Sequence, residues 1–427
     1  MMVAHLRAIP TKIGHVHIPK TAGTSVNSWL DDLVSFERAR PAVFPTRFAE
    51  FMRDHNVPVD VANELCSELS WKAYDIVHGH RDLIRAAPEG AFLFTFLRDP
   101  IQRAWSQYFD HSRLQEHDYA HLSKAFQRYH RAVRAHSFSQ SLKTLRNEPV
   151  LREIYEDRQC RALVSWKYSL DAFHELSPRQ RFEEAAEALT DKIDFAGIQE
   201  DVPRSMRALA AALGACPAQQ VRHLNVVERR TKAGEDEAVA NAILAEMNQA
   251  DQMLYDFATE RSQASLAAAE SYDEEDFESH YAHARVTALA KIVGNTGLYT
   301  MNHPLIGTGF SGRDSAGTEE CCRWTGPGTR SVIYLPFTGN RLRIFIRGWI
   351  DDAVRESFRL RVNGQPVDFS FEKQEGAEDV AVFQPSKGAA PYLKIEMEVA
   401  RTFKDQELGR PGGDTRSKGA SIWRIQY

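Results

Sequence analysis

One segment near the start of the chain has the layout of a strand, a loop of small residues and a helix. An apolar run over residues 13–18 is followed by the loop at residues 19–25, Pro-Lys-Thr-Ala-Gly-Thr-Ser, and then by residues 26–30. Such a loop directs backbone N–H groups and the positive end of a helix dipole to one point, where an anion binds favourably. Lys20 adds a full charge, and the loop hydroxyl groups add hydrogen-bond donors. The segment therefore predicts an anion site.

This loop differs from a Walker A phosphate loop. A Walker A loop places its lysine after a glycine and directly before Ser or Thr, whereas here Lys20 comes first and Gly23 follows it. Taken alone, the segment also fits an ordinary turn rich in Ser, Thr and Gly.

A second candidate anion site follows the apolar run of residues 91–97, which is typical of a strand buried on both faces. Asp99 is a good N-cap and Pro100 a good first helical residue, so a helix is expected to begin there. Arg98 then lies at the carboxyl end of the strand, and Ser106 lies about two turns into the helix. An arginine and a hydroxyl that converge in this way suit a phosphate monoester. A surface arginine at an ordinary helix start is the alternative.

Together the two segments resemble the two phosphate motifs of sulfotransferases, which use 3′-phosphoadenosine 5′-phosphosulfate (PAPS) as donor. The resemblance is closest to the carbohydrate branch that includes heparan 2-O-sulfotransferases and bacterial homologues, and it covers roughly residues 13–262. It implies that the first loop holds the 5′-phosphosulfate, that the second motif holds the 3′-phosphate, and that no metal is needed. The residues that it implies for the donor are Lys20, Thr21, Ala22, Gly23, Thr24, Ser25, Arg98 and Ser106.

Two histidines are the candidate catalytic residues. His78 and His80 stand near the end of a further expected strand, residues 74–79, and side chains two apart on a strand share one face. Sulfuryl transfer to an alcohol needs a base for the hydroxyl proton, and histidine suits that work near neutral pH. The resemblance implies His80 as general base, with His78 as its partner or a sulfuryl contact. It implies that Lys20 neutralises charge on the bridging oxygen of the donor.

Other interpretations of these histidines remain open. Many sulfotransferases use a glutamate as base, and two histidines on a strand are often structural. A metal site is a third interpretation, but no cysteine pair or His-Glu-x-x-His spacing accompanies them. We therefore expect no metal.

The composition excludes some function classes. The 427 residues include 26% charged residues with a net charge of −5, so the overall charge does not point to a nucleic-acid partner. No apolar run approaches the ~18 residues of a membrane span, and no secretory signal is recognised at the start of the sequence. The five cysteines form an odd set that implies no disulfide framework. These features favour a cytoplasmic bacterial enzyme.

Strands and helices alternate over residues 1–290, which predicts an α/β domain that binds PAPS. We expect a P-loop-like parallel sheet flanked by helices, the sulfotransferase fold. The pattern predicts a mainly helical region over residues 100–190 and one long helix over residues 235–268, and the acidic stretch Glu270–Glu278 is interpreted as a solvated linker. The expected strands are residues 13–19, 74–79, 91–97 and 193–198.

Residues 291–427 predict an accessory domain, an antiparallel β-sandwich, because short β-rich runs alternate there with Gly and Pro turns. Asn363-Gly364 is a strong hairpin signal. Three tryptophans could line a sugar groove, although packing in the sandwich core is the other interpretation: Trp324, Trp349 and Trp423. The expected strands include residues 331–335, 342–349, 358–362, 367–371, 379–383, 392–399 and 420–426.

The sequence thus favours a sulfotransferase that moves a sulfuryl group from PAPS to a hydroxyl of a saccharide or glycoconjugate acceptor. Two alternatives are a P-loop-type kinase of a small or sugar substrate and a non-catalytic glycan-binding protein. The sequence identifies neither the acceptor nor the oligomeric state.

Overall fold

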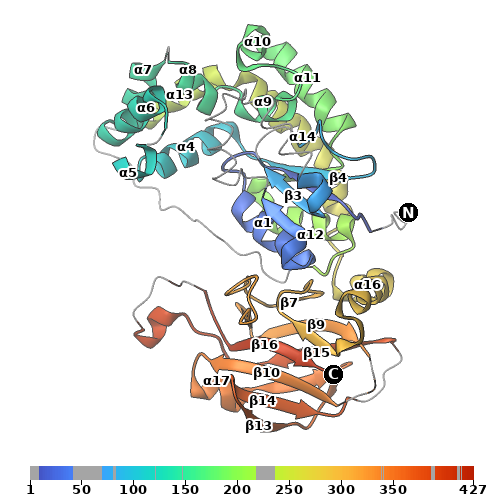
Figure 1. The fold of residues 1–427 in the computed structure, drawn as a ribbon. Helices are drawn as coiled ribbons and strands as arrows, with labels where there is room; N and C mark the ends of the chain where they lie inside the picture. The colour runs from blue at the N-terminus through green and yellow to red at the C-terminus, as the bar shows by residue number, and fades with distance from the viewer. Residues whose placement is uncertain are drawn as a thin grey trace.

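A computed structural model gives the architecture of the chain (Figure 1). It describes residues 9–41, 70–79, 83–120, 122–146, 148–217, 236–337, 339, 341–385, 390–410, 414 and 416–427. Over these ranges a parallel sheet covered by helices is followed by two antiparallel sheets. The expected combination of an α/β part with an antiparallel C-terminal part is confirmed.

The parallel sheet has the strand order β2-β3-β1-β4-β5. Its strands are β1 (Ile13–Val16), β2 (Ala39–Pro41), β3 (Ile76–Gly79), β4 (Phe92–Leu97) and β5 (Phe195–Ile198). From the central strand β1 the chain goes to one side for β2 and β3 and then to the other side for β4 and β5. The strand order therefore reverses between β1 and β4, and open α/β sheets bind ligands at the carboxyl ends of such a strand pair.

Helices cover both faces of this sheet, which explains why its central strands are mainly apolar. Along β4, Phe94 and Phe96 pack on one face, and Leu93 and Leu97 pack on the other. The first face is covered by α1 (Gly23–Leu30) and α12 (Val202–Leu213), and the second by α9 (Arg158–Val164), α11 (Pro178–Asp191) and α14 (Gln249–Ala268).

A separate helical layer stands beside the sheet and has its own core, which includes Trp105, Tyr108 and Phe138 (Figure 1). Its helices are α4 (Pro100–His111), α6 (Lys124–Ala135), α7 (Phe138–Leu145), α8 (Pro149–Tyr155) and α13 (Glu237–Met247). The described residues of this half also form α5 (Glu116–Tyr119) and α10 (Leu170–Glu175). The helical region expected over residues 100–190 is confirmed.

The prediction of a single helix over residues 235–268 is wrong. The chain breaks at Asn248, where φ is −123° and ψ is 36°, between the end of α13 and the start of α14. The carboxylate of Asp157 accepts hydrogen bonds from the backbone N–H groups of Ala250 and Asp251, both at 3.0 Å. This distant side chain caps a new helix, so the break depends on tertiary structure.

The C-terminal part consists of two antiparallel sheets, with strand orders β13-β14-β10-β16-β6 and β12-β11-β15-β9-β7. The side chains that the two sheets bury between them, such as Ile344 in the first sheet and Ile395 in the second, belong to one hydrophobic cluster. The strands are β6 (Leu298–Thr300), β7 (Gly307–Thr308), β8 (Arg323–Trp324, paired with β16), β9 (Arg330–Pro336), β10 (Leu342–Trp349), β11 (Arg359–Val362), β12 (Gln365–Pro366), β13 (Ser370–Gln374), β14 (Ala377–Phe383), β15 (Tyr392–Glu398) and β16 (Ala420–Gln426).

The hairpin expected at Asn363-Gly364 is confirmed. Val362 pairs with Gln365 across a two-residue turn, and φ is 52° at Asn363 and 78° at Gly364. Positive φ at both central residues is the geometry that favours the Asn-Gly pair.

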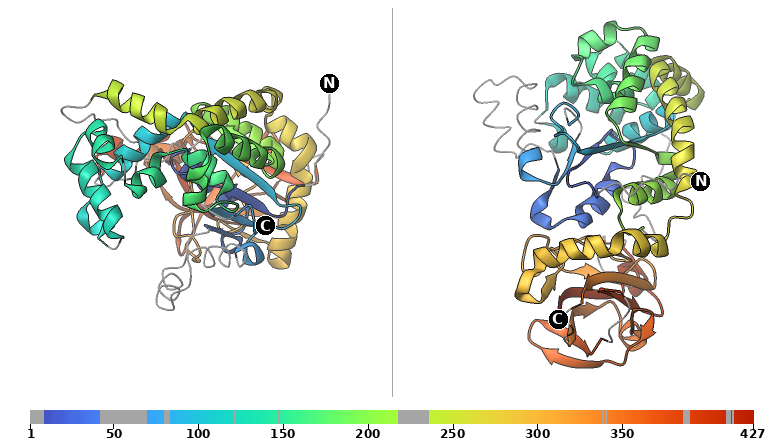
Figure 2. Two further views of the ribbon diagram at one scale, coloured as in Figure 1. Left: turned by 90° about the horizontal axis from the view of Figure 1, so that it is seen from above. Right: turned by 90° about the vertical axis from the view of Figure 1, so that its right-hand side faces the viewer.

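The linker expected at Glu270–Glu278 is wrong, because this stretch forms α15 (Glu274–Phe277) and packs against the C-terminal sheets. Glu274 accepts two hydrogen bonds from Arg330, and Tyr334 donates its hydroxyl to Glu278 at 2.8 Å. The helix that follows, α16 (His283–Val293), lies between the parallel sheet and the antiparallel sheets (Figure 2).

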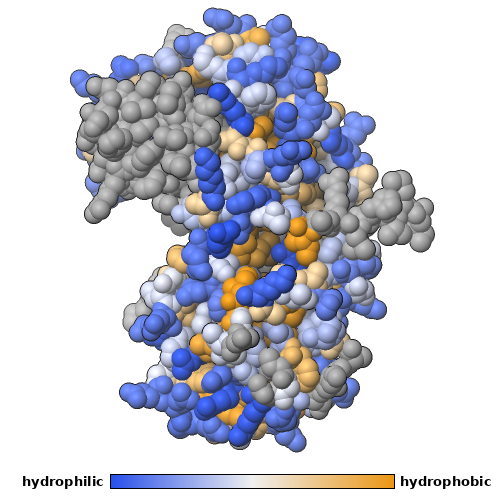
Figure 3. Space-filling view, turned by 45° about the vertical axis from the view of Figure 1, so that its right-hand side comes forward, coloured by the Kyte–Doolittle hydropathy of each residue, from blue (hydrophilic) through white to orange (hydrophobic). Residues whose placement is uncertain are grey.

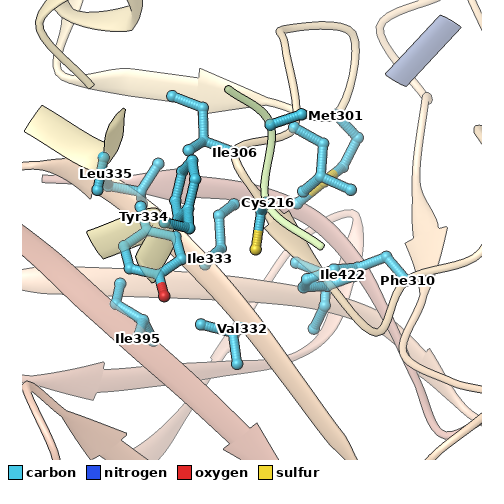
Figure 4. Close-up of a cluster of buried hydrophobic side chains, with 14 of the residues drawn as sticks. Cys216, Met301, Ile306, Phe310, Val332, Ile333, Tyr334, Leu335, Ile395 and Ile422 are labelled. Atoms are coloured by element: carbon cyan, nitrogen blue, oxygen red, sulfur yellow. The ribbon is translucent and has the colours of Figure 1, made fainter. Parts of the chain in front are cut away.

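One hydrophobic cluster continues from the parallel sheet into the C-terminal part. Cys216, which follows α12, lies among Ile306, Ile333 and Tyr334 (Figure 4). A buried ion pair joins the same two parts: Nη1 of Arg323 lies 2.7 Å from Oδ1 of Asp32, at the end of α1. The two parts therefore share a core as well as a charged contact.

The three candidate tryptophans do not line one groove. Trp349 is buried in the large core and donates its Nε1–H to Asp379, whereas Trp423 packs with Phe345 in a separate small cluster. Trp324 packs against the large core, with the ammonium of Lys418 over its ring. Among the described residues, no helix combines the length and the apolar character that crossing a membrane requires.

Candidate functional site

The loop between β1 and α1 follows a partly left-handed path. Lys20 has φ of 73° and Ala22 has φ of 70°, which is uncommon for residues with a side chain. Thr21 is fully buried and donates its hydroxyl to the carbonyl of Ile18 at 2.8 Å. The hydroxyl of Thr21 therefore donates its hydrogen bond within the loop, and this bond fixes the shape of the loop.

Gly23 allows the loop to close over a histidine. A Cβ atom at this position would lie 1.8 Å from Nε2 of His17, so no larger residue fits beside that ring. The ring of His17 in turn stacks on His15, with centroids 5.3 Å apart. The segment from β1 to α1 is thus held in place by close side-chain packing beneath the loop.

Helix α1 starts at this loop without a side-chain cap. Its N-cap residue is Ala22, and the carbonyl of Ala22 accepts from the N–H groups of Ser25 and Val26. The side chain of Thr24 is exposed and that of Ser25 is buried. The positive end of the helix dipole is therefore not offset by any capping side chain, which suits the approach of an anion.

Arg98 lies directly against this loop. Its Nη1 donates to the backbone carbonyl of Lys20 at 3.1 Å, across 78 residues of sequence. Gln159 holds the backbone of Arg98 from the other side, since Arg98 N–H donates to Oε1 at 2.9 Å and Nε2 donates to the Arg98 carbonyl at 2.8 Å. The structure thus brings together the two segments singled out in the sequence.

Two carboxylates stand beside the two cations. Nζ of Lys20 lies 3.3 Å from Oδ2 of Asp110, and Nε of Arg98 lies 4.0 Å from Oε1 of Glu200. The cations are largely buried, with 18% and 15% of their side chains exposed, whereas the carboxylates are 49% and 37% exposed. An incoming anion would therefore compete for each cation with a carboxylate that is partly exposed to solvent.

Ser106 lies on the side of α4 that approaches the loop. It stands four residues before Asp110, the partner of Lys20, so both share one face of the helix. The start of α4 is as expected: Asp99 caps it by accepting from the N–H of Gln102 at 2.7 Å, and Pro100 is its first residue.

Two residues of this site were missed by the sequence analysis. Glu200 follows β5 and accepts from the backbone N–H of Asp99 at 3.1 Å and from the hydroxyl of Tyr255 at 3.0 Å. Burial and the neighbouring Glu200 raise the pKa of Tyr255, so this phenol stays protonated. Glu200 could have been identified from the sequence, because it directly follows β5, the strand next to β4. Gln159 has no such signal, because it is recognised only by its contact with Arg98.

Gln159 is itself positioned by helix capping. Asp251, in the first turn of α14, accepts from the N–H groups of Gln159 and Cys160 at 2.9 and 2.8 Å, and so caps α9. Asp157 precedes α9 and caps α14 in return. The two helices thus fix each other's first turns, and this fixes the side chain that holds Arg98.

His78 contacts the residue that follows the last turn of α1. Nε2 of His78 lies 3.6 Å from Oδ1 of Asp31, the residue that follows the last turn of α1, whereas the lysine precedes the first turn. The side chain of His78 therefore faces the C-terminal end of α1, while its backbone lies opposite His15 in β1. His80, the expected general base, lies outside the described residues.

Over the part of the chain that the structure describes, no three His, Cys, Asp or Glu side chains are grouped so that they could hold a metal ion. The four described cysteines are free thiols. A scan against models of known protein families finds no match to this chain, and a search of curated proteins finds none either.

Proposed function

We propose that this chain is a PAPS-dependent sulfotransferase and that its parallel sheet has the P-loop-like sulfotransferase fold. The observation that carries the proposal is the hydrogen bond from the Arg98 guanidinium to the Lys20 carbonyl. It joins the loops after β1 and β4, where the strand order reverses. A ligand with two separate phosphate groups could contact both loops at this point.

The site fits a doubly phosphorylated nucleotide better than a single anion. Lys20 and the uncapped N-terminus of α1 would hold the 5′-phosphosulfate, together with the neighbouring loop residues 21–25. Arg98 and Ser106 would hold the 3′-phosphate, since Arg98 bonds to that loop and Ser106 shares a face of α4 with Asp110, the partner of Lys20. Each group would gain a full cation and hydrogen-bond donors, and such charge-assisted bonds are roughly twice as strong as neutral ones.

In the proposed reaction the acceptor hydroxyl oxygen attacks the sulfur of PAPS. A new S–O bond forms as the bond to the bridging oxygen breaks, and its electron pair leaves with adenosine 3′,5′-bisphosphate. His80 takes the hydroxyl proton, and Lys20 neutralises the charge that develops on the bridging oxygen. His78, whose Nε2 lies 3.6 Å from Oδ1 of Asp31, is proposed as the partner of His80 or as a contact to the sulfuryl group. The acceptor is proposed to be a saccharide or glycoconjugate.

Calorimetry with adenosine 3′,5′-bisphosphate tests donor binding. We expect binding to the wild-type chain and a loss of about tenfold or more with Lys20→Ala or Arg98→Ala, since each removes a charged hydrogen-bond donor. Lys192→Ala and Arg179→Ala are matched controls, because both residues are exposed on or beside α11 and away from the site. No heat with the wild-type protein would overturn the proposal.

Transfer of label from ³⁵S-PAPS to a mixture of glycans tests the reaction. Transfer that depends on Lys20 and His80 supports the proposal. ATP binding that requires Mg²⁺, without binding of the bisphosphate, would instead support a kinase. Glycan binding with neither nucleotide would support a non-catalytic glycan-binding protein.

A further inference from the structure

A cavity of about 420 Å³ lies at the junction between the parallel sheet and the C-terminal part. It is lined by Leu33, Val34, Ser35, Glu37, Arg38, Asp75, Ala215, Cys216, Phe277, Arg285, Ala288, Leu289, Ile292, Pro304, Leu305 and Ile306. Arg38 precedes β2 and Asp75 precedes β3, so the cavity lies at the amino ends of these strands. Lys20 and Arg98 follow the carboxyl ends of β1 and β4. The cavity is therefore separate from the candidate functional site.

The walls of the cavity are mainly apolar. Helix α16 contributes Arg285, Ala288, Leu289 and Ile292, which are three or four residues apart and so share one face of the helix. Ile292 is 50% exposed, one of the few large apolar residues that the described part of the chain leaves open to solvent. Figure 3 shows apolar side chains gathered in the hollow between the upper and lower parts of the molecule.

Arg285 is the one cation of the cavity for which no ion pair with a described carboxylate is found. Its Nε and Nη2 donate to the carbonyls of Gly214 and Leu213 at the end of α12, at 3.0 and 2.6 Å. Burial lowers the pKa of Arg285 to about 10, although the group stays charged at neutral pH. A guanidinium has five N–H donors, so two carbonyls do not use them all. Buried charges are ordinarily paired, and this one has only neutral partners.

The other charged groups around the cavity are arranged differently. Arg38 makes two hydrogen bonds to the carboxylate of Asp75, at 2.9 and 2.8 Å, so these two charges offset each other. Glu37 is exposed and is the remaining carboxylate of the lining. An incoming anion would therefore be drawn to Arg285 rather than to the arginine that Asp75 neutralises.

We propose that this cavity binds a small amphiphilic carboxylate of the medium-chain fatty acid type. Its hydrocarbon chain would lie along the apolar face of α16, and its carboxylate would pair with Arg285. The volume falls in the range of about 300–1,000 Å³ that is typical of small-molecule sites, which are mostly apolar with few polar groups. A charge-assisted pair with a guanidinium accounts for the preference for a carboxylate.

The test measures the binding of decanoate and of decanol by calorimetry on the full chain. We expect decanoate to bind at least tenfold more tightly than decanol, and we expect Arg285→Gln to remove that preference. Arg285→Lys, which keeps the charge, should retain part of it. Melting temperatures show whether these variants are folded, since Arg285 also bonds to the end of α12.

A second pair of variants tests the location without changing any charge. Ala288→Trp places a large ring in the cavity and should weaken decanoate binding at least tenfold. Ala284→Trp is the matched control, because Ala284 is exposed on the same helix and does not line the cavity. Equal binding of decanoate and decanol, or decanoate binding that Ala288→Trp leaves unchanged, would overturn the proposal. Adenosine 3′,5′-bisphosphate binding should be the same in all these variants. A failure of the decanoate prediction can therefore be distinguished from a failure of the proposed function.

Discussion

The Arg98 guanidinium donates a hydrogen bond to the backbone carbonyl of Lys20, 3.1 Å away, so a single side chain connects the loops that follow β1 and β4. Because the acceptor is a backbone atom, the contact depends on the path of the loop and not on the identity of the residue at position 20. Gln159 fixes the backbone of Arg98, and the hydrogen bond to the Lys20 carbonyl places its guanidinium. The site is therefore organised before any ligand binds.

Replacing Arg98 by lysine tests this organisation. A guanidinium can hold the Lys20 carbonyl with one nitrogen and a phosphate with the others, whereas an ammonium is a single point charge. We expect Arg98→Lys to weaken adenosine 3′,5′-bisphosphate binding by about ten- to a hundredfold, because a lost hydrogen bond to a charged group costs ~1.5–3 kcal/mol. Calorimetry measures the change, and Arg179→Lys is the control on an exposed helix face. Equal affinities would show that only the charge matters.

Removing the charge of Asp110 should have the opposite effect. Its carboxylate lies 3.3 Å from the Lys20 ammonium and is 49% exposed, so it competes weakly with an incoming phosphate. Ion pairs of this kind contribute ~0.2–1 kcal/mol, which predicts that Asp110→Asn binds the bisphosphate about two- to fivefold more tightly. The gain should diminish at high salt. Asp191→Asn, at the exposed end of α11, is the control, and weaker binding by Asp110→Asn would contradict the prediction.

The parts of the fold that depend on local chemistry could be predicted from the sequence. The apolar runs predicted β1, β3, β4 and β5 but not β2, and the strand expected at 367–371 begins later, at Ser370. Asp99-Pro100 predicted the start of α4, and Asn363-Gly364 predicted a hairpin turn. The break at Asn248 could not be predicted, because the residue that caps α14 lies 93 residues earlier in the chain. Glu274 looked like a solvated acid, since its partner Arg330 belongs to the C-terminal sheets.

The same distinction applies to the candidate site. The two segments that contain Lys20 and Arg98 could be found because each has a characteristic local sequence, and parallel strand ends meet at one edge of a sheet. Gln159, which holds the backbone of Arg98, has no local pattern, and Glu200, which bonds to Asp99, has only its place after a strand to identify it. The contact of His78 with Asp31 depends on the direction in which α1 crosses the sheet, which alternation along a strand does not specify.

Gly23 provides a test of the loop's packing. Its backbone would accept alanine, but the added Cβ would lie 1.8 Å from Nε2 of His17. We expect Gly23→Ala to lower the free energy of unfolding by ~1–3 kcal/mol, as overpacking does, and to weaken bisphosphate binding. Adding His17→Ala removes the ring and should recover part of the binding. Gly328→Ala, where a Cβ would meet nothing within 4 Å, is the control. A double variant no better than Gly23→Ala would show that the ring is not the obstacle.

The C-terminal part offers a test of pH dependence at Asp379. This carboxylate is fully buried and accepts hydrogen bonds from Trp349, Arg355 and Lys373. Burial alone would raise the pKa of Asp379, but these hydrogen bonds outweigh it and lower the pKa to about 2. Because the pKa in the unfolded chain is about 3.9, the group stabilises the fold above about pH 4. That contribution, about 2 kcal/mol, is lost as the pH falls towards 2.

The variant Asp379→Asn cannot titrate, so its free energy of unfolding should fall less steeply than that of the wild type between about pH 4 and pH 2. Asparagine also loses the ion pairs with Arg355 and Lys373, so the variant should be the less stable protein above pH 4 and the difference should shrink in acid. Urea denaturation across this range measures both effects. Asp352→Asn, at an exposed position in α17 (Asp352–Ser357), should follow the wild type. A constant difference between Asp379→Asn and the wild type at every pH would mean that the carboxylate titrates as it does in the unfolded chain.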